Sequence, residues 1–241
     1  MAVHGMIDIE TLDVFPTATV LTLGAVKFNP IDDSEPHSEL YLKILVDDQD
    51  RLGRTTSDST IEWWSKQDPA VMEEAFDQTG AVTVEEALTQ LNKWVVGVDE
   101  IWGHGYGFDI TILENMYRML GKPIPWQFWQ ISDSRTITKR MLKDPRKDMQ
   151  TDLHNALADA YFQAKSVQII FKHHGWTSKV IRWYDWAVAF LAADFMFANI
   201  SLAFIGPVWY IQLFGVCTAY FIYDLWIDYC NFRKKHEYGK Q

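Results

Sequence analysis

Carboxylates and a histidine stand in three separate segments of this chain. Asp8 and Glu10 lie in Gly-Met-Ile-Asp-Ile-Glu-Thr, Asp109 follows Gly-Tyr-Gly-Phe, and His154 and Asp159 frame His-Asn-Ala-Leu-Ala-Asp. Hard divalent ions such as Mg²⁺ take oxygen ligands, and histidine side chains titrate near neutral pH. The set predicts a site that holds two divalent metals and activates a water molecule, which is nuclease chemistry.

The first acidic pair lies within an apolar run. On a strand, Asp8 and Glu10 point to the same face, where two carboxylates repel each other without a cation between them. A solvated acidic strand end is the simpler alternative. The neighbours Met6, Ile7 and Ile9 favour a buried strand, and a metal site fits that burial better.

The other three residues have ordinary interpretations when each is taken alone. Asp109 opens a helical pattern after a glycine-rich turn, so it could be an N-cap. His154 could be a polar residue on the surface of a helix start. A helix that began at His154 would rotate Asp159 away by about 140°. The two side chains therefore converge only if His154 lies at the junction before the helix.

The elements that must position these residues begin as strands and continue as strands alternating with helices. This order predicts an α/β fold, with a mixed sheet and helices on its faces. We expect strands over 3–9, 18–28, 38–46 and 100–103, and helices over 60–76 with a break at Pro69, from the N-cap Thr83 to about Val96, over 109–120, and from His154, capped by Asp152, to about His173.

Composition narrows the classes of function. The 241 residues suffice for one large domain and an appendage, and the net charge of −10 excludes a broad basic face for gripping duplex phosphates. A hydrolase that takes one strand end needs only a small local site. Cys217 and Cys230 form neither a disulfide framework nor a metal-type spacing. With no signal-peptide pattern at the first residues, they predict a cytoplasmic catalytic domain.

Residues 179–241 differ in character from residues 1–178, so we expect a domain boundary between them. Residues 183–230 are almost continuously apolar and aromatic, interrupted by a Gly-Pro turn, and basic residues flank both ends. Each half has the roughly 20 residues needed to cross a bilayer, which predicts a membrane hairpin with both termini in the cytoplasm. Asp194 would be costly inside a span. The alternative is a helix pair buried in a homodimer or against the first domain.

The combined motifs resemble those of the DEDDh family of 3′-5′ exonucleases, which has a ribonuclease H-like fold. Asp8 and Glu10 match its first motif, Phe108-Asp109 the second, and the His154–Asp159 run the third. Over roughly residues 3–175 the chain is more narrowly similar to the phage exonuclease A and ribonuclease AS branch, through Glu62-Trp63-Trp64 with Gln67, Trp102-Gly103 and Asp133-Ser-Arg135-Thr136. One departure is His104, where that branch would have asparagine. The other is the apolar tail.

The resemblance implies a two-metal mechanism. Asp8, Glu10, Asp109 and Asp159 would hold two Mg²⁺ or Mn²⁺ ions, and His154 would take the proton of the attacking water. The chain would release nucleoside 5′-monophosphates from the 3′ end of single-stranded RNA or DNA. The expected substrate contacts are Thr11, Leu12, Trp63, Trp64 and Phe108.

Several of these contacts have structural alternatives. Leu12 could wedge against a base or belong to the core. Trp63 and Trp64 could stack on bases, although paired tryptophans are more often core residues. We favour a structural role for Arg135 over a phosphate contact, and a solvated helix end for His173-His174 over metal ligation.

Two functions therefore compete. The first is a metal-dependent 3′-5′ exonuclease tethered to a membrane. The second is a catalytically inactive, membrane-attached nucleic-acid-binding or adaptor module with the same fold. The intact set of five residues favours the enzyme, because loss of a ligand is the usual mark of inactive relatives. The choice between RNA and DNA stays open, since no residue is visibly placed to read a 2′-hydroxyl.

Overall fold

The computed structural model describes residues 2–105, 107–149 and 154–176. These residues fall within the first of the two units into which the chain divides, Met1–Ser178 and Lys179–Gln241. The predicted hairpin at residues 183–230 and the predicted cap Asp152 lie outside the described residues. Among the helices of the described part, none is both long and apolar enough to cross a bilayer.

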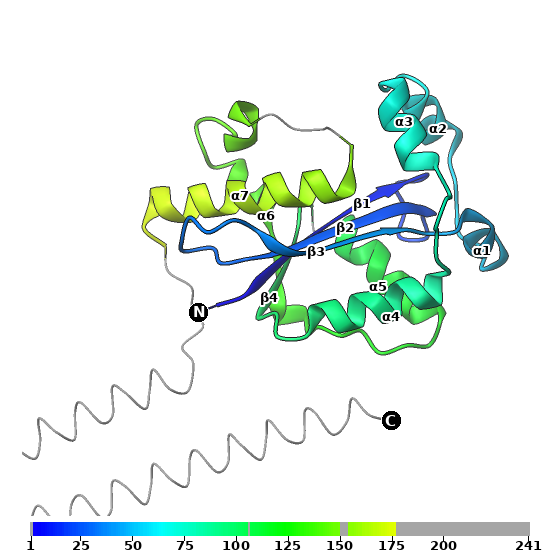
Figure 1. Cartoon of the computed structure of the whole chain (residues 1–241), viewed down its shortest axis with the longest axis horizontal. Helices are drawn as coiled ribbons and strands as arrows, with labels where there is room; N and C mark the ends of the chain where they lie inside the picture. The colour runs from blue at the N-terminus through cyan, green and yellow to red at the C-terminus, as the bar shows by residue number, and fades with distance from the viewer. Residues whose placement is uncertain (1, 106, 150–153, 177–241) are drawn as a thin grey trace, which may run out of the picture. The chain divides into compact units, whose positions relative to one another are not determined.

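A mixed sheet forms the centre of the described residues (Figure 1). β1 pairs antiparallel with β2 and parallel with β4, β2 pairs antiparallel with β3, and β4 pairs parallel with β5. β1 and β2 are buried along almost their full length, as expected for central strands covered on both faces. In the order β3-β2-β1-β4-β5, the strands are His37–Lys43, Val20–Phe28, His4–Thr11, Glu100–Gly103 and Ile131–Asp133.

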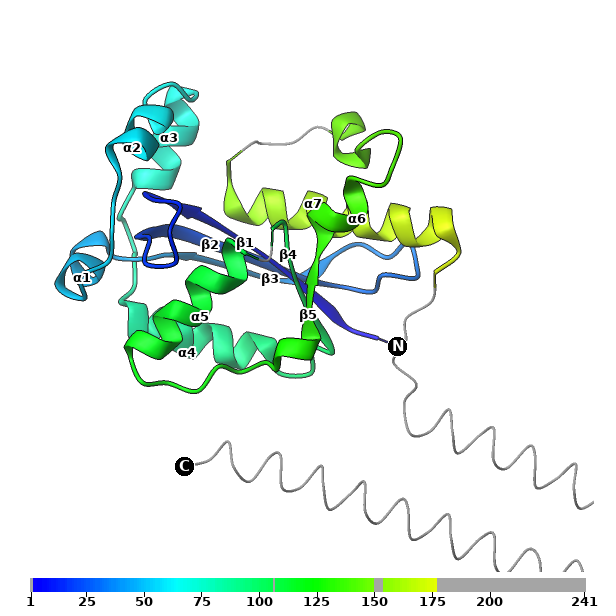
Figure 2. The same ribbon diagram turned by 180° about the vertical axis from the view of Figure 1, so that it is seen from behind.

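Helices α4 (Val84–Val95) and α5 (Asp109–Met119) cover one face of this sheet (Figure 2). The Thr83 side chain caps α4 by accepting a hydrogen bond from the backbone N–H of Glu86, as its sequence predicts. The apolar stripes of both helices pack on Ile7 and other residues of the central strands to form the larger hydrophobic core.

Helices α7 (Ala156–His174) and α6 (Ser134–Thr138) cover the opposite face. Alanines on α7 pack against Met6, Val26 and Phe28 of the sheet. Gly24 of β2 permits the closest approach, because a Cβ there would lie 2.2 Å from the backbone of Ala156. The start of α7 is therefore seated directly on β2, and this contact fixes the height of α7 above the sheet.

Three short helices, α1 (Val46–Arg51), α2 (Asp58–Trp64) and α3 (Pro69–Phe76), gather at one end of the sheet (Figure 1). Side chains of Ser57 and Asp68 cap α2 and α3. Two 3₁₀ turns, η1 (Phe128–Gln130) and η2 (Pro145–Asp148), complete the described elements.

The predicted mixed sheet flanked by helices is confirmed for the described residues. The break at Pro69 is also confirmed, since it separates α2 from α3. Two expectations were wrong. The third strand ends at Lys43 and the chain turns into α1, rather than running to residue 46. The last helix begins at Ala156 rather than at His154, because the Asn155 side chain caps it by accepting from the N–H groups of Leu157 and Ala158.

Candidate active site

Strand β1 presents Asp8 and Glu10 to the α7 side of the sheet. Side chains alternate along a strand, and Met6 packs beneath α7 whereas Ile7 and Ile9 belong to the core on the other face. Asp8 and Glu10 share the face of Met6. Both are buried, so the solvated strand end considered for this pair does not describe it.

Asp109 reaches the same region from the start of α5. Only 2% of the residue is exposed, and its Oδ2 accepts a hydrogen bond of 3.1 Å from the backbone N–H of His104. Gly103 ends β4 close by, and a Cβ there would lie 3.1 Å from this carboxylate oxygen. Phe108 occupies the N-cap position and Asp109 the first turn. Capping, the ordinary interpretation of Asp109, is therefore not its role.

His154 lies at the junction before α7. Its backbone is left-handed, with φ of 65°, and its N–H donates a hydrogen bond of 3.0 Å to Oδ2 of Asp159. The rotation of a regular helix therefore does not separate the two side chains. His154 and Asp159 converge because the helix starts two residues after His154.

The three segments meet at one site. Ligand atoms of Glu10, His154 and Asp159 all lie within 4.8 Å of one another. Asp8 and Asp109 lie close enough that their charges act on each other and on Glu10. The structure thus brings together all five residues that the sequence singled out.

Burial and mutual repulsion make these carboxylates weak acids. Burial raises the pKa of Glu10 to about 8, and the charges of Asp159 and Asp109 add to the shift. Burial likewise raises the pKa of Asp109 to about 7 and that of Asp8 well above its ordinary value. The pKa of Asp159 is raised by burial as well. Such a cluster of oxygen donors favours a divalent cation, which would offset the repulsion.

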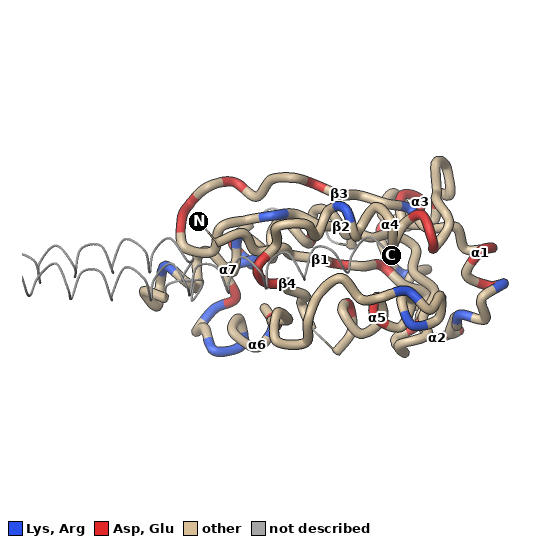
Figure 3. The backbone as a smooth tube through the Cα atoms, turned by 90° about the horizontal axis from the view of Figure 1, so that it is seen from below, with Lys and Arg blue, Asp and Glu red and all other residues tan. Residues whose placement is uncertain are grey.

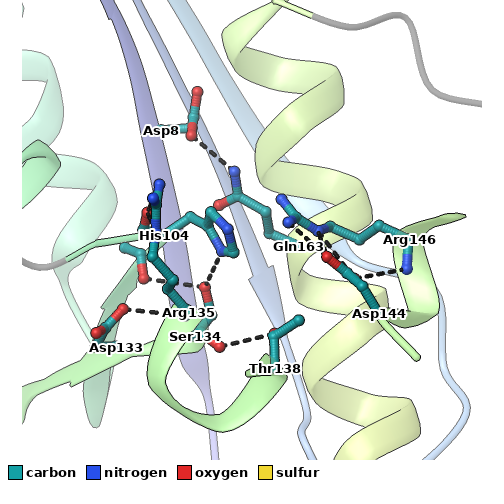
Figure 4. A network of polar contacts seen from close by, with 10 residues as sticks. Asp8, His104, Asp133, Ser134, Arg135, Thr138, Asp144, Arg146 and Gln163 are labelled. Atoms are coloured by element: carbon teal, nitrogen blue, oxygen red, sulfur yellow. Dashed lines mark hydrogen bonds and ion pairs between the residues drawn. The ribbon is translucent and has the colours of Figure 1, made fainter. Parts of the chain in front are cut away.

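Gln163 holds Asp8 in place, and sequence reasoning missed this residue. Its Nε2 donates a hydrogen bond of 2.7 Å to Asp8 Oδ1 (Figure 4). Gln163 lies four residues after Asp159 on α7, which places both on one face of the helix. A glutamine one turn after a motif carboxylate was the available signal.

A cleft opens beside Glu10 and His154, with a volume of about 520 Å³. Its wall includes Trp63, which is 41% exposed and meets the His154 ring edge to face at 4.8 Å between centroids. Its lining residues are Ile9, Glu10, Thr11, Val14, Ser59, Thr60, Trp63, Trp64, Phe108, Arg135 and His154. Of the expected substrate contacts, Thr11, Trp63, Trp64 and Phe108 line this cleft.

Leu12 and Trp64 are core residues. Leu12 packs in a small core with Trp64, Leu21 and Ala75, so it has no free face to wedge against a base. Trp64 is 1% exposed, and its indole N–H donates to the carbonyl of Thr11 at 2.9 Å. Trp64 therefore takes the core role that is more frequent for paired tryptophans, rather than the stacking role considered for it, and it supports the end of β1.

Arg135, His173 and His174 are the remaining polar residues for which two roles were considered. The guanidinium of Arg135 donates from Nε and Nη2 to the carbonyl of His104, at 3.0 and 2.8 Å. This contact has a structural role, yet Arg135 also lines the cleft. His173 and His174 lie exposed in the last turn of α7, as expected for a solvated helix end.

Comparison with known proteins shows which family has a matching sequence. Residues 3–171 match the family described as the 3′-5′ exoribonuclease Rv2179c-like domain. The exodeoxyribonuclease of Enterobacteria phage T4 is 27% identical over 161 residues, covering 57% of this chain and 71% of that protein.

Two solved structures are similar in outline. Exonuclease X in complex with 5′ overhanging duplex DNA has a TM-score of 0.48 and 17% identity, covering 73% of this chain and 95% of that one. The nuclease domain of 3′hExo, a DEDDh family member bound to rAMP, has a TM-score of 0.48 and 12% identity, covering 73% and 94%.

An α/β domain that gathers four carboxylates and a histidine at the end of its central strand is the arrangement expected of a 3′-5′ exonuclease of the DEDDh class. Because the family match spans more than half of the chain, the chain belongs to the 3′-5′ exoribonuclease Rv2179c-like domain family. The predicted resemblance to 3′-5′ exonucleases is confirmed.

Proposed function

We propose that this chain shortens a single nucleic-acid strand from its 3′ end and releases nucleoside 5′-monophosphates. Asp8, Glu10, Asp109 and Asp159 would hold two Mg²⁺ or Mn²⁺ ions. The observation that carries this proposal is the convergence of Glu10, His154 and Asp159, whose ligand atoms lie within 4.8 Å of one another beside two further buried carboxylates.

The residues present fit such ions. Their donors are carboxylate oxygens, which Mg²⁺ and Mn²⁺ prefer, and burial leaves the carboxylates short of compensating charge. Two bound ions would acidify a water molecule and neutralise charge that develops on the phosphate. Gln163 fixes one oxygen of Asp8 and the His104 N–H fixes one oxygen of Asp109, so these side chains are oriented in advance.

His154 is the proposed general base. Its ring lies beside the oxygens of Glu10 and Asp159, where the proton of an attacking water would be released. The Trp63 ring contacts one side of the imidazole. The hydrogen bond from the His154 backbone N–H to Asp159 fixes the backbone position from which the imidazole projects. The imidazole nitrogen would accept the proton while hydroxide attacks the terminal phosphodiester.

The cleft beside His154 is the proposed place of the terminal nucleoside. Trp63 and the half-buried Phe108 line it, and aromatic faces stack on any base without reading its identity. Trp63 is therefore the residue of the adjacent tryptophan pair that would meet the base.

An end-labelled oligonucleotide with Mg²⁺ tests the proposal. We expect a ladder of products shortened from the 3′ end and free mononucleotides, lost in EDTA and in an Asp109→Asn variant. Binding of the oligonucleotide without any release of mononucleotide would contradict the proposal and favour an inactive binding module.

The sugar preference is a separate question. The matched family is described as an exoribonuclease, whereas the phage T4 relative is called an exodeoxyribonuclease. Matched ribo- and deoxyribo-oligomers of one sequence, compared by kcat/KM, measure the preference directly.

We also propose that residues 183–230 attach the catalytic domain to the cytoplasmic face of a membrane, on the strength of their apolar sequence and flanking basic residues. Fractionation of the full chain tests this. Recovery in the membrane fraction, released only by detergent, is expected. A chain that stays soluble without detergent would refute attachment, and a dimer in solution would then support the buried helix pair.

A further inference from the structure

A second cavity, here called the basic pocket, lies between α6 and η2. Its volume is about 370 Å³. Figure 4 shows Arg135 and Arg146 on two sides of the His104 ring. The lining residues are His104, Arg135, Thr138, Lys139, Met141, Asp144, Arg146 and Lys147. The catalytic mechanism proposed above uses none of the cations in this set.

The charge of the basic pocket opposes that of the chain. Its lining carries the cations Arg135, Lys139, Arg146 and Lys147 and a single carboxylate, Asp144, although the whole chain has a net charge of −10. Figure 3 shows Lys and Arg positions grouped beside α6. A local excess of cations in a concave site attracts anions more strongly than the same charges spread over a surface.

The two arginines are held ready by other groups. Arg146 contacts Asp144 through Nε and through Nη2, the latter at 2.8 Å, and Asp144 also caps η2. Arg135 is fixed by the carbonyl of His104. Guanidinium groups held in this way lose little freedom when they meet a phosphate.

The lysines remain available. Lys139 and Lys147 are exposed, and within the part of the chain that the structure describes neither ammonium forms an ion pair. A long flexible side chain that ends in a free ammonium is suited to a mobile anion such as a backbone phosphate.

The basic pocket adjoins the catalytic site. Arg135 lines both the basic pocket and the cleft of Glu10 and His154. Arg146 lies near enough to Asp159 to act on its carboxylate. A strand whose 3′ terminal nucleoside fills the cleft has all its other phosphates on the 5′ side, so only those can reach the basic pocket.

We propose that the basic pocket binds a backbone phosphate of the substrate strand on the 5′ side of the scissile bond. This inference rests on the proposed exonuclease function. The basic pocket holds the strand after each cleavage and makes turnover depend on strand length. The ligand is a phosphodiester, and its alternative sources are a second strand and a free mononucleotide.

The test is a double variant, Lys139→Ala with Lys147→Ala, in the full chain. The matched control removes two lysines from the layer of α4 and α5, Lys93→Ala with Lys122→Ala, of which Lys122 pairs with an exposed glutamate. The substrates are a 20-nucleotide single strand and a dinucleotide with one phosphodiester.

We expect the double variant to raise the KM for the long strand about fivefold or more and to raise that for the dinucleotide much less. The dependence of KM on salt should become shallower, with the slope reduced by about 0.7 for each phosphate that the variant no longer neutralises. The control should change neither KM. Equal effects on both substrates, or an unchanged salt slope, would overturn the proposal.

Two further measurements separate the sources. If the basic pocket took a free product, inhibition by a nucleoside 5′-monophosphate would weaken in the double variant while the KM for the long strand stayed constant, which would overturn the proposal. If it took a second strand, only a duplex with a 3′ end would show the effect, and the proposal would again fail. If the wild-type chain released no mononucleotide from any substrate, that result would instead refute the exonuclease function itself.

Discussion

Asp109 is the most deeply buried carboxylate of the acidic cluster, which consists of Asp8, Glu10, Asp109 and Asp159. Its burial makes it the sharpest probe of the metal proposal. Asparagine keeps its shape and can still accept from the His104 N–H, but it removes the charge. We expect Asp109→Asn to lower kcat/KM more than about 100-fold. Without metal, its melting temperature should be equal to or above that of wild type, because a repulsive buried acid is gone. Assays with Mg²⁺ and thermal unfolding in EDTA give both values.

The conservative variant Asp13→Asn is the control, because it removes a buried carboxylate just after β1 that is not one of the proposed metal ligands. Asp13 is buried and accepts from the backbone of Val14, and it belongs to no part of the acidic cluster. Full activity in Asp109→Asn would contradict the proposed metal ligation whatever the control shows.

His154 is proposed to act as the general base, whereas the four carboxylates are proposed to hold the metal ions. We expect His154→Gln to lower kcat about 100-fold or more, as loss of a general base does, with little change in oligonucleotide affinity measured by fluorescence anisotropy with Ca²⁺. A normal kcat would assign the proton transfer to another group.

The proposed catalytic residues could be named from sequence because their types are rare in apolar runs and their motifs are specific. The motifs alone were enough to propose Asp8, Glu10 and Asp109 as metal ligands. The support from Gln163 was not predictable, because a glutamine within a helix is common and its value comes from the distance to Asp8 across the sheet–helix interface. The choice between core and substrate contact stayed open for Leu12 and Trp64 for a related reason, since an apolar residue type is equally common in a core and in a binding cleft.

The junction before α7 brings His154 and Asp159 together, and the position of this junction depends on its contact with β2. At Gly24 a side chain would meet the backbone of Ala156 and Leu157. We expect Gly24→Ala to destabilise the domain by about 1–3 kcal/mol, measured by urea unfolding, and to lower kcat as the start of α7 is displaced from Glu10. The substitution acts on activity through position, because Gly24 contacts no substrate.

Gly107→Ala is the matched control for stability. Among the described residues, no heavy atom beyond the glycine and its chain neighbours lies within 4 Å of a Cβ at that position. The free energy of unfolding of this variant should therefore stay within about 0.5 kcal/mol of wild type. A Gly24→Ala variant as stable and active as wild type would show that α7 is not held at this height by β2.

The length of an element decides whether its sequence predicts it. The long, strongly patterned elements, β1, β2, α4 and α5, were found because their periodicity and caps are local. The three-residue β5 and the five-residue α6 were missed, since neither is long enough to show a period. The basic pocket lies between α6 and the four-residue turn η2, so the sequence pattern did not predict it.

At the scale of the whole domain, the acidic cluster couples folding to pH and to metal. The pKa of Glu10 rises from 4.5 to about 8 and that of Asp109 from 3.8 to about 7 on folding. Between those limits the folded domain without metal binds more protons than the unfolded chain, so its stability falls as pH rises. Asp77, whose pKa is lowered, acts in the opposite direction but is already ionised above pH 5. The buried histidines His4 and His104, whose pKa values fall from 6.5 to about 4 on folding, also act in the opposite direction, but only up to about pH 6.5.

We therefore expect the melting temperature in EDTA to fall between about pH 6.5 and pH 8.5, where only the raised carboxylates still titrate, and saturating Mg²⁺ or Mn²⁺ to raise it most at the upper end, since bound cations favour the ionised carboxylates. Metal binding at pH 7 should release protons, measurable by calorimetry in buffers of different ionisation enthalpy. In Asp109→Asn the fall with pH should be shallower, because one of the raised groups no longer titrates. If metal stabilised the wild-type domain equally at both ends of the range, the carboxylates would already be ionised in its absence, and the acidic cluster would not need a cation to hold its charge.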